Sequence, residues 1–365
     1  MSDFDVLIVG GGIAGASLGA EIAGELRVGI VEAESHCGMH ATGRSAAFWL
    51  ESYGGPQVAL LSAASREFLL NPPADFSEEG FLRERGDVHL TKDELPVLPP
   101  GVVSRVVERD ELERIIPGIC PQWRRGLFEP GCADIDVAAL HSAYLRRFRK
   151  LGGQVATNAS LDGAVFGDGA WTVRLADGST VQTRLIVNAA GAWADAVARA
   201  CGVRPLGISA KRRTMVQLRV GRSGLRELPL VDDADGTFYF KGEGDRSVWL
   251  SPHDEIESDP CDAAPEEIDV ALAIDRFEQV VDWPVEAVER SWAGLRSFAP
   301  DRIPVYGFDP EVRSFFWCAG QGGFGIQTAP AAARLAASIL TGRPPDATVA
   351  HIEASVFSPA RFASD

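Results

Sequence analysis

The sequence predicts a mixed α/β fold in which two domains are interleaved along the chain. Three observations support this prediction. A β-branched apolar run at 4–9 leads through a glycine-rich turn into an Ala/Leu/Glu-rich helix at 14–25, as at the start of a βαβ unit. From about 203 to 291 the pattern is rich in strands, and from 315 to 340 a strand, a glycine loop and a helix return. The first domain is therefore expected to consist of separate segments around a β-rich insertion.

The glycine-rich turn has the spacing Gly-x-Gly-x-x-Gly. Gly10, Gly12 and Gly15 permit a sharp turn, close approach of the backbone to a pyrophosphate, and tight packing of the helix on the sheet. The N-terminus of the following helix offers N–H groups and a partial positive charge to phosphates. A second strand at 28–31 ends at Glu32, where an acid can accept a hydrogen bond from a ribose hydroxyl. The unit predicts dinucleotide binding. The Glu32 carboxylate would repel a 2′-phosphate, which favours FAD or NAD over NADP. The position of the motif near the N-terminus favours FAD over NAD.

Composition restricts the possible functions. The 365 residues exceed the core of one typical domain, and the net charge of −16 argues against nucleic acid and anionic membranes as partners. The six cysteines are scattered without metal-like pairs, so reduced thiols and no metal site are expected. No apolar run approaches the roughly 20 residues that span a bilayer. The chain enters a strand directly without a signal peptide, so a cytoplasmic location is expected.

The remaining elements follow in order along the chain. A Gly/Ser/Ala-rich passage at 36–53 precedes a helix at 57–70, and prolines then punctuate a region of short strands that includes 86–90. Asp136 is expected to cap a helix at 137–151, whose basic end suits a helix C-terminus. Strands of the first domain are expected near 170–175 and 185–187, and strands of the insertion at 214–220, 237–241 and 247–251.

These elements predict a division into two domains. A discontinuous Rossmann-like domain is expected to comprise residues 1–80, 135–200 and 296–365. The β-rich domain is expected to comprise 81–134 and 201–295 and to carry the substrate site.

Four passages carry a family resemblance. They are Thr-Gly-Arg-Ser-Ala-Ala at 42–47, Val-Asn-Ala-Ala-Gly-Ala-Trp-Ala-Asp at 187–195, Trp-Ala-Gly-Leu-Arg-Ser-Phe at 292–298, and Gln-Gly-Gly-Phe-Gly-Ile-Gln-Thr at 321–328. The sequence resembles the D-amino-acid oxidase-type family of FAD-dependent amine oxidoreductases, and within it the bacterial D-arginine dehydrogenases. The resemblance implies a glutathione-reductase-type FAD fold.

The glycine turn and the resemblance together predict the residues that contact FAD. They are Gly10, Gly12, Ile13, Ala14, Gly15, Glu32, Ala33, Thr42, Gly43, Arg44, Ser45, Ala46, Ala190, Gly191, Trp193, Gly322, Gly323, Phe324, Gly325, Ile326 and Gln327. The binding is expected to be non-covalent, because these loops hold no cysteine apart from Cys318, which lies in a predicted strand. His40 is the alternative anchor.

The chemistry of amino-acid oxidation indicates which residues hold the substrate. A hydride leaves Cα for flavin N5 while the amine is neutral, so the protein mainly supplies position and electrostatics. A guanidinium best holds the α-carboxylate. Arg296 lies among apolar neighbours, and its alternative role is an internal salt bridge. Arg213 lies in a basic run, and its alternative role is that of a solvated residue at a strand edge. The resemblance adds Tyr53 and Tyr239 as pocket residues and Gly323 as acceptor for the substrate amine.

The side chain of the substrate is less constrained. Phe48, Leu50, Asp87 and Gln327 are predicted to line its pocket. The resemblance gives a histidine and a threonine where this chain has Phe48 and Leu50, which favours an apolar substrate. It gives a glutamate where this chain has Asp87, which favours a cationic one. Both alternatives remain open, with a slight preference for the apolar side chain.

The predicted function is FAD-dependent oxidative deamination of D-amino acids, giving an imino acid that hydrolyses to a 2-oxo acid. The electron acceptor, oxygen or a quinone-like carrier, stays open. Oxidation of glycine, sarcosine or another secondary amine acid is one alternative. An NAD(P)H-dependent flavin monooxygenase is another, but a second glycine fingerprint is missing from the sequence. A catalytically silent flavoprotein subunit is the third.

Overall fold

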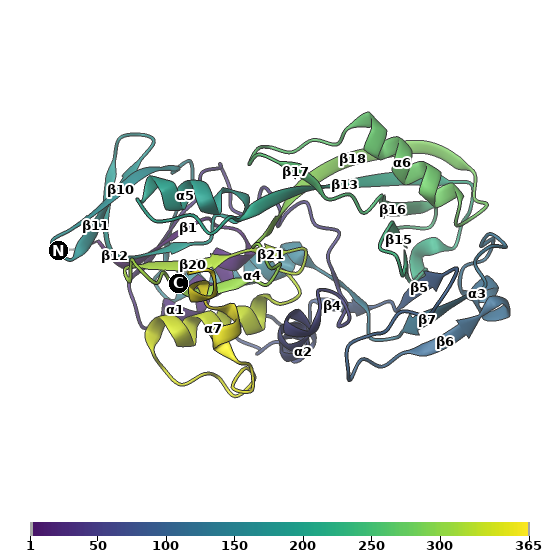
Figure 1. The fold of residues 1–365 in the computed structure, drawn as a ribbon, viewed down its shortest axis with the longest axis horizontal. Helices are drawn as coiled ribbons and strands as arrows, with labels where there is room; N and C mark the ends of the chain where they lie inside the picture. Colours follow the sequence, from purple (N-terminus) through teal and green to yellow (C-terminus); the bar gives the residue numbers. More distant parts are fainter. Residues whose placement is uncertain (1–2, 364–365) are drawn as a thin grey trace.

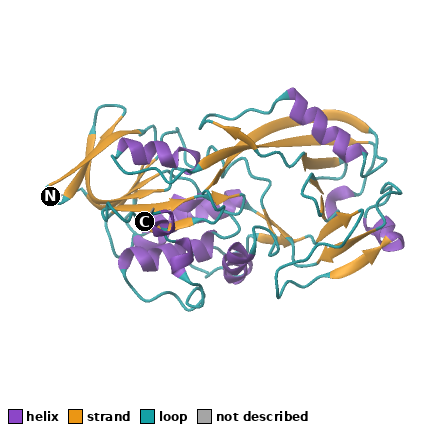
Figure 2. Cartoon of the chain, viewed as in Figure 1, coloured by secondary structure: helices purple, strands orange, loops and turns teal. Residues whose placement is uncertain are grey.

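The computed structural model describes residues 3–363 and confirms the mixed α/β architecture. The two ends of the elongated molecule differ in composition: helices surround the sheet nearest the termini, whereas the far end is mostly strand (Figure 2). No helix within residues 3–363 has the length and apolar character needed to cross a membrane.

An eight-stranded sheet forms the first part of the molecule, in the order β10-β11-β12-β1-β2-β9, with β20 on β12 and β19 on β20. Its centre is parallel: β1 pairs in parallel with β2 and β12, and β12 pairs in parallel with β20. Its strands are β1 (Phe4–Val9), β2 (Val28–Val31), β9 (Gln154–Ala156), β10 (Leu161–Gly167), β11 (Ala170–Leu175), β12 (Thr180–Asn188), β19 (Val305–Phe308) and β20 (Phe315–Ala319).

Helices cover this sheet, and α1 packs against both α4 and α7. A Cβ at Gly15 would lie 2.0 Å from the carbonyl oxygen of Gly10, so only glycine lets α1 approach the strand this closely. The predicted cap is present, because the Asp136 side chain accepts from the Ala139 N–H at the start of α4. The helices here are α1 (Ile13–Ile22), α2 (Pro56–Leu70), α4 (Val137–Lys150), α5 (Ala194–Ala200) and α7 (Ala329–Thr341), with short 3-10 turns at Gly191–Trp193, Ala354–Phe357 and Pro359–Phe362.

A ten-stranded sheet forms the β-rich part, in the order β21-β18-β13-β16-β15-β14-β5-β7-β6, with β17 on β13. Its strands are β5 (Asp87–Thr91), β6 (Arg105–Glu108), β7 (Arg125–Glu129), β13 (Ser209–Val220), β14 (Leu230–Asp233), β15 (Tyr239–Gly242), β16 (Ser247–Ser251), β17 (Ile256–Ser258), β18 (Val285–Phe298) and β21 (Gln321–Gly322). The helices α3 (Arg109–Ile115) and α6 (Glu267–Glu278) and the 3-10 turn Leu225–Glu227 accompany it. A small third sheet contains β3 (Phe48–Trp49), β8 (Ala133–Ile135) and β4 (Leu82–Glu84).

Two long antiparallel strands, β13 and β18, connect the two ends of the molecule (Figure 1). Their register places Arg213 opposite Gly294 and Lys211 opposite Arg296. Both predicted substrate arginines are therefore carried by the strand pair where it approaches the first sheet.

The predicted division into domains stays a prediction. Its boundary at 296 falls inside β18, and β21 of the last segment pairs with that strand in the β-rich sheet. The outermost residues of the predicted first domain, 1–2 and 364–365, lie outside the described residues.

Candidate active site

A cavity of about 400 Å³ lies along the carboxyl ends of β1, β2 and β12 and continues to the end of β18. It is lined by all but four of the residues predicted to contact FAD, together with Arg213, Tyr239, Arg296 and Gly323. Residues from four separate parts of the sequence thus meet around one elongated space, which is the arrangement that a dinucleotide requires.

The glycine turn shapes one end of this cavity. Gly10 has a φ of 104°, and a Cβ there would lie 2.5 Å from the carbonyl oxygen of Ala189. Glu32 lines the cavity and also holds the turn, because its Oε2 accepts from the Gly11 N–H at 2.8 Å and its Oε1 from the Glu34 N–H at 3.0 Å. The carboxylate therefore fixes the loop and faces the space where a ribose would lie.

The start of α1 fits a pyrophosphate. Gly12 is the N-cap residue of a helix whose first turn contains no acidic side chain, so no carboxylate opposes a bound phosphate. The Ile13 N–H donates to Thr42 Oγ1 at 3.0 Å, which fastens the loop of residues 38–46 over the helix start. A Cβ at Gly12 would lie 3.2 Å from the same oxygen, so a side chain there would crowd this cradle. These residues fit FAD.

Four predicted FAD contacts do not line the cavity, and each has a packing role instead. Gly15 and Gly43 lie where a Cβ would approach backbone carbonyl oxygens at 2.0 and 2.6 Å. The Phe324 ring packs against Tyr53, with 5.4 Å between the ring centroids. Gln327 is buried: its Oε1 accepts from the Leu50 N–H and its Nε2 donates to the Leu50 carbonyl and the Ser62 hydroxyl. Gln327 lines neither this cavity nor the smaller one described below. The predictions that it contacts FAD and that it lines the substrate side-chain pocket must therefore both be corrected.

The loop before α6 also contributes to the cavity, which the sequence did not indicate. Arg44 Nη1 donates to the carbonyl oxygens of Ala263 and Ala293, and Arg44 also pairs with Asp262. This arginine therefore draws the loop over the cavity, and Cys261 and Ala263 join the lining. Cys261 is thus a further cysteine near the predicted FAD site, in addition to the buried Cys318 and to Cys37, whose Sγ would lie 2.4 Å from a Cβ at Gly11.

Arg296 forms the centre of the predicted substrate clamp. Its Nη1 donates to Tyr53 Oη at 2.9 Å. Burial opposes its charge, but Tyr53, Tyr239 and the Glu255 carboxylate together outweigh this and raise the pKa of Arg296 above its usual value. A Cβ at Gly323 would lie 2.6 Å from Tyr53 Oη and 2.9 Å from Arg296 Cζ, so this glycine lets the backbone approach the pair. The side chain of Arg296 forms no salt bridge with an acid among the described residues, so the alternative role of an internal salt bridge is not what the structure shows.

Arg213 is the second guanidinium at the cavity. It is 4% exposed, so it does not lie at a solvated strand edge. Its Nε donates to the carbonyl oxygen of Asp254, while Nη1 and Nη2 have no hydrogen-bond partner within residues 3–363. Glu255 Oε1 lies 3.6 Å from Nη2. Burial, and next to it the charge of Arg296, lower the pKa of Arg213. A buried and a partly buried guanidinium at one cavity, with unpartnered N–H groups on Arg213, favour an anionic ligand.

A second cavity of about 230 Å³ adjoins the first, and Arg296 and Tyr239 line both. Phe48, Leu50 and Tyr53 form one apolar wall of it. The remaining walls come from segments that the sequence did not indicate: they are Ser52, Gly54, His89, residues 96–99, residues 232–234, Gly236, Phe238 and His253. Burial, with the charge of Arg213, lowers the pKa of His253 to about 3, so this imidazole is neutral.

Asp87 requires a correction. It is fully buried and lines neither cavity, so it does not contact a substrate side chain. His89, two residues further along β5, lies on the same face and lines the smaller cavity with Asp232 of β14. The strand pattern alone does not distinguish a residue at the cavity from one packed behind its neighbour.

Comparisons with known proteins agree with this geometry. Residues 5–339 match the family model described as FAD dependent oxidoreductase. The chain is 26% identical to the FAD-dependent oxidoreductase domain-containing protein 1 of Bos taurus, covering 92% of this chain and 81% of the relative. It is 27% identical to the mitochondrial sarcosine dehydrogenase of Homo sapiens over 67% of this chain, which is 28% of that relative.

Solved structures share the fold. The glycine oxidase of Geobacillus kaustophilus matches with a TM-score of 0.82 and 19% identity over 99% of both chains. The L-proline dehydrogenase of P. horikoshii matches with a TM-score of 0.81 and 18% identity, covering 98% of this chain and 97% of that chain.

Proposed function

The chain belongs to the family of FAD-dependent oxidoreductases, and from this premise we propose that it oxidises the CH–NH₂ group of D-amino acids. The substrate loses a hydride and a proton to become an imino acid, which water converts to a 2-oxo acid and ammonia. FAD, when bound, supplies the hydride acceptor, flavin N5. The configuration rests on the resemblance of the four sequence passages, and the narrower likeness to D-arginine dehydrogenases stays a prediction.

The observation that carries the proposal is the position of Arg296 and Tyr53 where the two cavities meet. A carboxylate bound there receives a charge-assisted hydrogen bond from the guanidinium and one from the phenol. Cα of the substrate is then held at the entrance of the larger cavity while its side chain extends into the smaller one. Positioning of this kind accounts for much of the rate enhancement in hydride transfer.

The amine is deprotonated through the field of the two arginines in this proposal. His253 lines the side-chain cavity, but its lowered pKa makes it a weak base. The positive charges of Arg213 and Arg296 disfavour an ammonium group beside them and so lower its pKa. The carbonyl oxygen of Gly323 is proposed to accept from the neutral amine.

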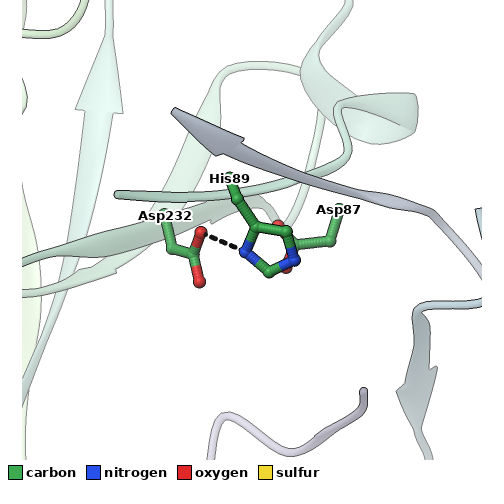
Figure 3. Close-up of side chains that lie close together, drawn as sticks. All are labelled: Asp87, His89 and Asp232. Carbon is green, nitrogen blue, oxygen red and sulfur yellow. Dashed lines mark hydrogen bonds and ion pairs between the residues drawn. The ribbon is translucent and has the colours of Figure 1, made fainter. Parts of the chain in front are cut away.

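An apolar or aromatic side chain fits the smaller cavity best. Phe48, Leu50 and Tyr239 line it, and Asp87 is shielded from it. The two acids that do reach this cavity are already engaged, Asp232 with His89 (Figure 3) and Asp233 with Thr237. Glycine or sarcosine would leave the cavity beyond Arg296 largely empty, which forgoes the free energy of burying apolar surface. The likeness to human sarcosine dehydrogenase nevertheless makes oxidation of glycine or an N-methyl amino acid the second candidate.

FAD is proposed to bind without a covalent bond. His40, the predicted alternative anchor, pairs with Glu34 at 2.8 Å and packs on the Trp193 ring, so it is already engaged. Release of FAD into the supernatant on acid denaturation supports the proposal, whereas flavin retained on the precipitated chain contradicts it. A cytoplasmic location stays a prediction.

The proposed function is tested by mixing the enzyme anaerobically with candidate substrates and following reduction of its flavin. D- and L-amino acids, glycine and sarcosine separate the amine-oxidation candidates. NADH and NADPH test for the monooxygenase, which one of them would reduce. If no amine and no reduced nicotinamide reduces the flavin, a catalytically silent subunit is favoured. Where the flavin is reduced, readmission of air shows whether oxygen reoxidises it.

A further inference from the structure

Side chains hold both polar backbone groups of Gly11, the middle residue of the glycine turn. Its N–H donates to Glu32 Oε2 at 2.8 Å, and its carbonyl oxygen lies 2.8 Å from Nε2 of His141, a residue of α4 that is 130 positions away in the chain. A Cβ at Gly11 would lie 2.4 Å from Cys37 Sγ, so no side chain fits there. Residues from three separate segments therefore fix this part of the turn.

The contact with His141 is a hydrogen bond whose direction is known. A carbonyl oxygen can only accept, so Nε2 of His141 carries a proton and donates it to Gly11. Burial lowers the pKa of His141 below its usual value, so the ring is neutral near pH 7 and this is its one N–H proton. The preferred tautomer is therefore set by the turn.

No other group replaces this donor. Gly11 is buried, and His141 is only 8% exposed. Within residues 3–363 the Gly11 carbonyl accepts from no second donor, because the backbone bond at the start of α1 runs from the Ala16 N–H to Gly12 instead. Without His141 this carbonyl would be a buried acceptor lacking a partner, which is unfavourable. The turn would then be free to reorient.

The direction of the Gly11 carbonyl determines the direction of the next N–H. The peptide bond between Gly11 and Gly12 is trans, so the carbonyl and the Gly12 N–H point to opposite sides of one plane. His141 holds the carbonyl on the side of α4, and the N–H therefore points away from that helix. Gly12 lines the larger cavity, and its N–H has no acceptor within residues 3–363. A free donor is thus aimed where the pyrophosphate is expected.

The same imidazole borders the loop that covers the start of α1. Gly38 begins this loop with a φ of 82°, and a Cβ there would lie 2.8 Å from Cε1 of His141. The Gly38 carbonyl accepts from the Gly43 N–H at 2.8 Å, and Thr42 of the loop accepts from Ile13. His141 therefore contacts both backbone segments that surround the space for the pyrophosphate.

We propose that His141 is a positioning residue for FAD, which holds the Gly11 carbonyl away from the cavity so that the Gly12 N–H donates to the pyrophosphate. His141 lines neither cavity, so it acts through the turn and does not touch the cofactor. The inference does not depend on which amine the enzyme oxidises. The sequence did not indicate this residue, because a histidine within a helix carries no motif and only the packing of α1 on α4 brings it to the turn.

Fluorescence titration of the apoprotein with FAD tests this role. His141→Leu removes the donor and should raise the Kd for FAD by about 5- to 100-fold. His141→Gln provides an amide N–H at a similar reach and should stay within about threefold of the unmodified chain. Leu145→Ala, a buried position one turn further along the same face of α4, is the matched control for lost packing and should also bind FAD normally.

The outcomes that overturn the proposal are distinct. Unchanged FAD affinity in His141→Leu would show that the hydrogen bond does not organise the turn. An equal loss in His141→Gln, or in Leu145→Ala, would make the packing of α4 the cause. If His141→Leu does not fold, His141→Asn takes its place, because its shorter side chain keeps an amide but does not reach the carbonyl.

Phosphorus NMR of FAD bound at saturation gives a readout that a loss of stability alone would not change. The two pyrophosphate resonances are expected to shift in His141→Leu or His141→Asn and to coincide with those of the unmodified chain in His141→Gln and Leu145→Ala. Identical resonances in all of these proteins would overturn the proposal, because the pyrophosphate would then have the same donors with and without His141.

Discussion

Arg296 Nη1 lies 2.9 Å from Tyr53 Oη, although the two residues are 243 positions apart in the chain. Arg296 comes from the end of β18 and Tyr53 from the loop after β3. The contact joins the β-rich sheet to the loop that lines the smaller cavity. It leaves the remaining guanidinium N–H groups of Arg296 available where the two cavities meet.

Replacing Arg296 by methionine tests the carboxylate clamp. Methionine keeps the apolar stem, so the protein should fold and retain FAD. We expect kcat/KM for the preferred amino acid to fall by about 10²–10⁴, because the lost charged contact lets Cα move from its reactive position. Steady-state kinetics measures this, with Arg290→Met on the outer part of β18 as the matched control. Unchanged kinetics in Arg296→Met would show that the arginine does not bind substrate.

A side chain at Gly12 should prevent FAD binding. The Cβ position lies 3.2 Å from Thr42 Oγ1 in the cradle at the start of α1, so the branched side chain of Gly12→Val occupies the space proposed for the pyrophosphate. The purified variant is expected to be colourless and folded by circular dichroism. Gly167→Val, at a position with open space around the Cβ, is the control and should remain yellow.

Glu32→Gln refines the same test. The amide keeps one oxygen acceptor for the turn but loses the charge, so FAD affinity should weaken by about 1.5–3 kcal/mol at most. Fluorescence titration of the apoprotein with FAD measures the change, and unaltered affinity would contradict a ribose contact.

Phe48→Ala tests the side-chain cavity. The Phe48 ring lies 6.1 Å from Tyr53 and 5.8 Å from Tyr239 between centroids, so it is a wall of that cavity. Its loss should lower kcat/KM for D-leucine and D-phenylalanine by roughly 10- to 100-fold, which corresponds to about 1.5–3 kcal/mol of lost burial. Glycine should be affected much less. Equal loss for glycine and D-phenylalanine would place the defect in flavin positioning instead.

His253 makes stability depend on pH. Its pKa falls from an ordinary 6.5 to about 3 on folding, so between those values the unfolded chain binds more protons and stability decreases as the pH falls. At pH 5 this amounts to about 2 kcal/mol at most. Asparagine tolerates the local φ of 54°, so His253→Asn should fold. In urea unfolding, its free energy of unfolding should decrease less between about pH 7.5 and pH 5 than that of the parent chain. The exposed His351→Asn is the control; a variant with the same pH dependence as the parent chain would contradict the shifted pKa.

The sequence predicted the parts of the fold that local pattern determines. The helix expected at 137–151 is Val137–Lys150, with the expected cap at Asp136, because capping and periodicity act within one or two turns. The strand expected at 214–220 begins earlier, at Ser209. Three of its five additional residues, Lys211, Arg212 and Arg213, are basic, and pairing with β17 and β18 rather than local propensity makes them strand.

The site was predicted less completely, for a physical reason. Short motifs mark backbone turns, so the glycine turns were found, whereas the direction of a long side chain depends on tertiary packing. Gln327 turns away to the backbone of Leu50, and Asp87 is covered by His89. His89 and Asp232 carry no motif, and only the register of β5 and β14 brings them together.

Anaerobic reduction of the enzyme-bound flavin by single enantiomers tests the central proposal most directly. We expect D-leucine or D-phenylalanine to bleach the oxidised flavin absorbance rapidly, the L-enantiomer and D-lysine to do so far more slowly, and Arg296→Met to abolish the difference. Faster bleaching by an L-amino acid, by sarcosine or by a reduced nicotinamide than by any D-amino acid would contradict it.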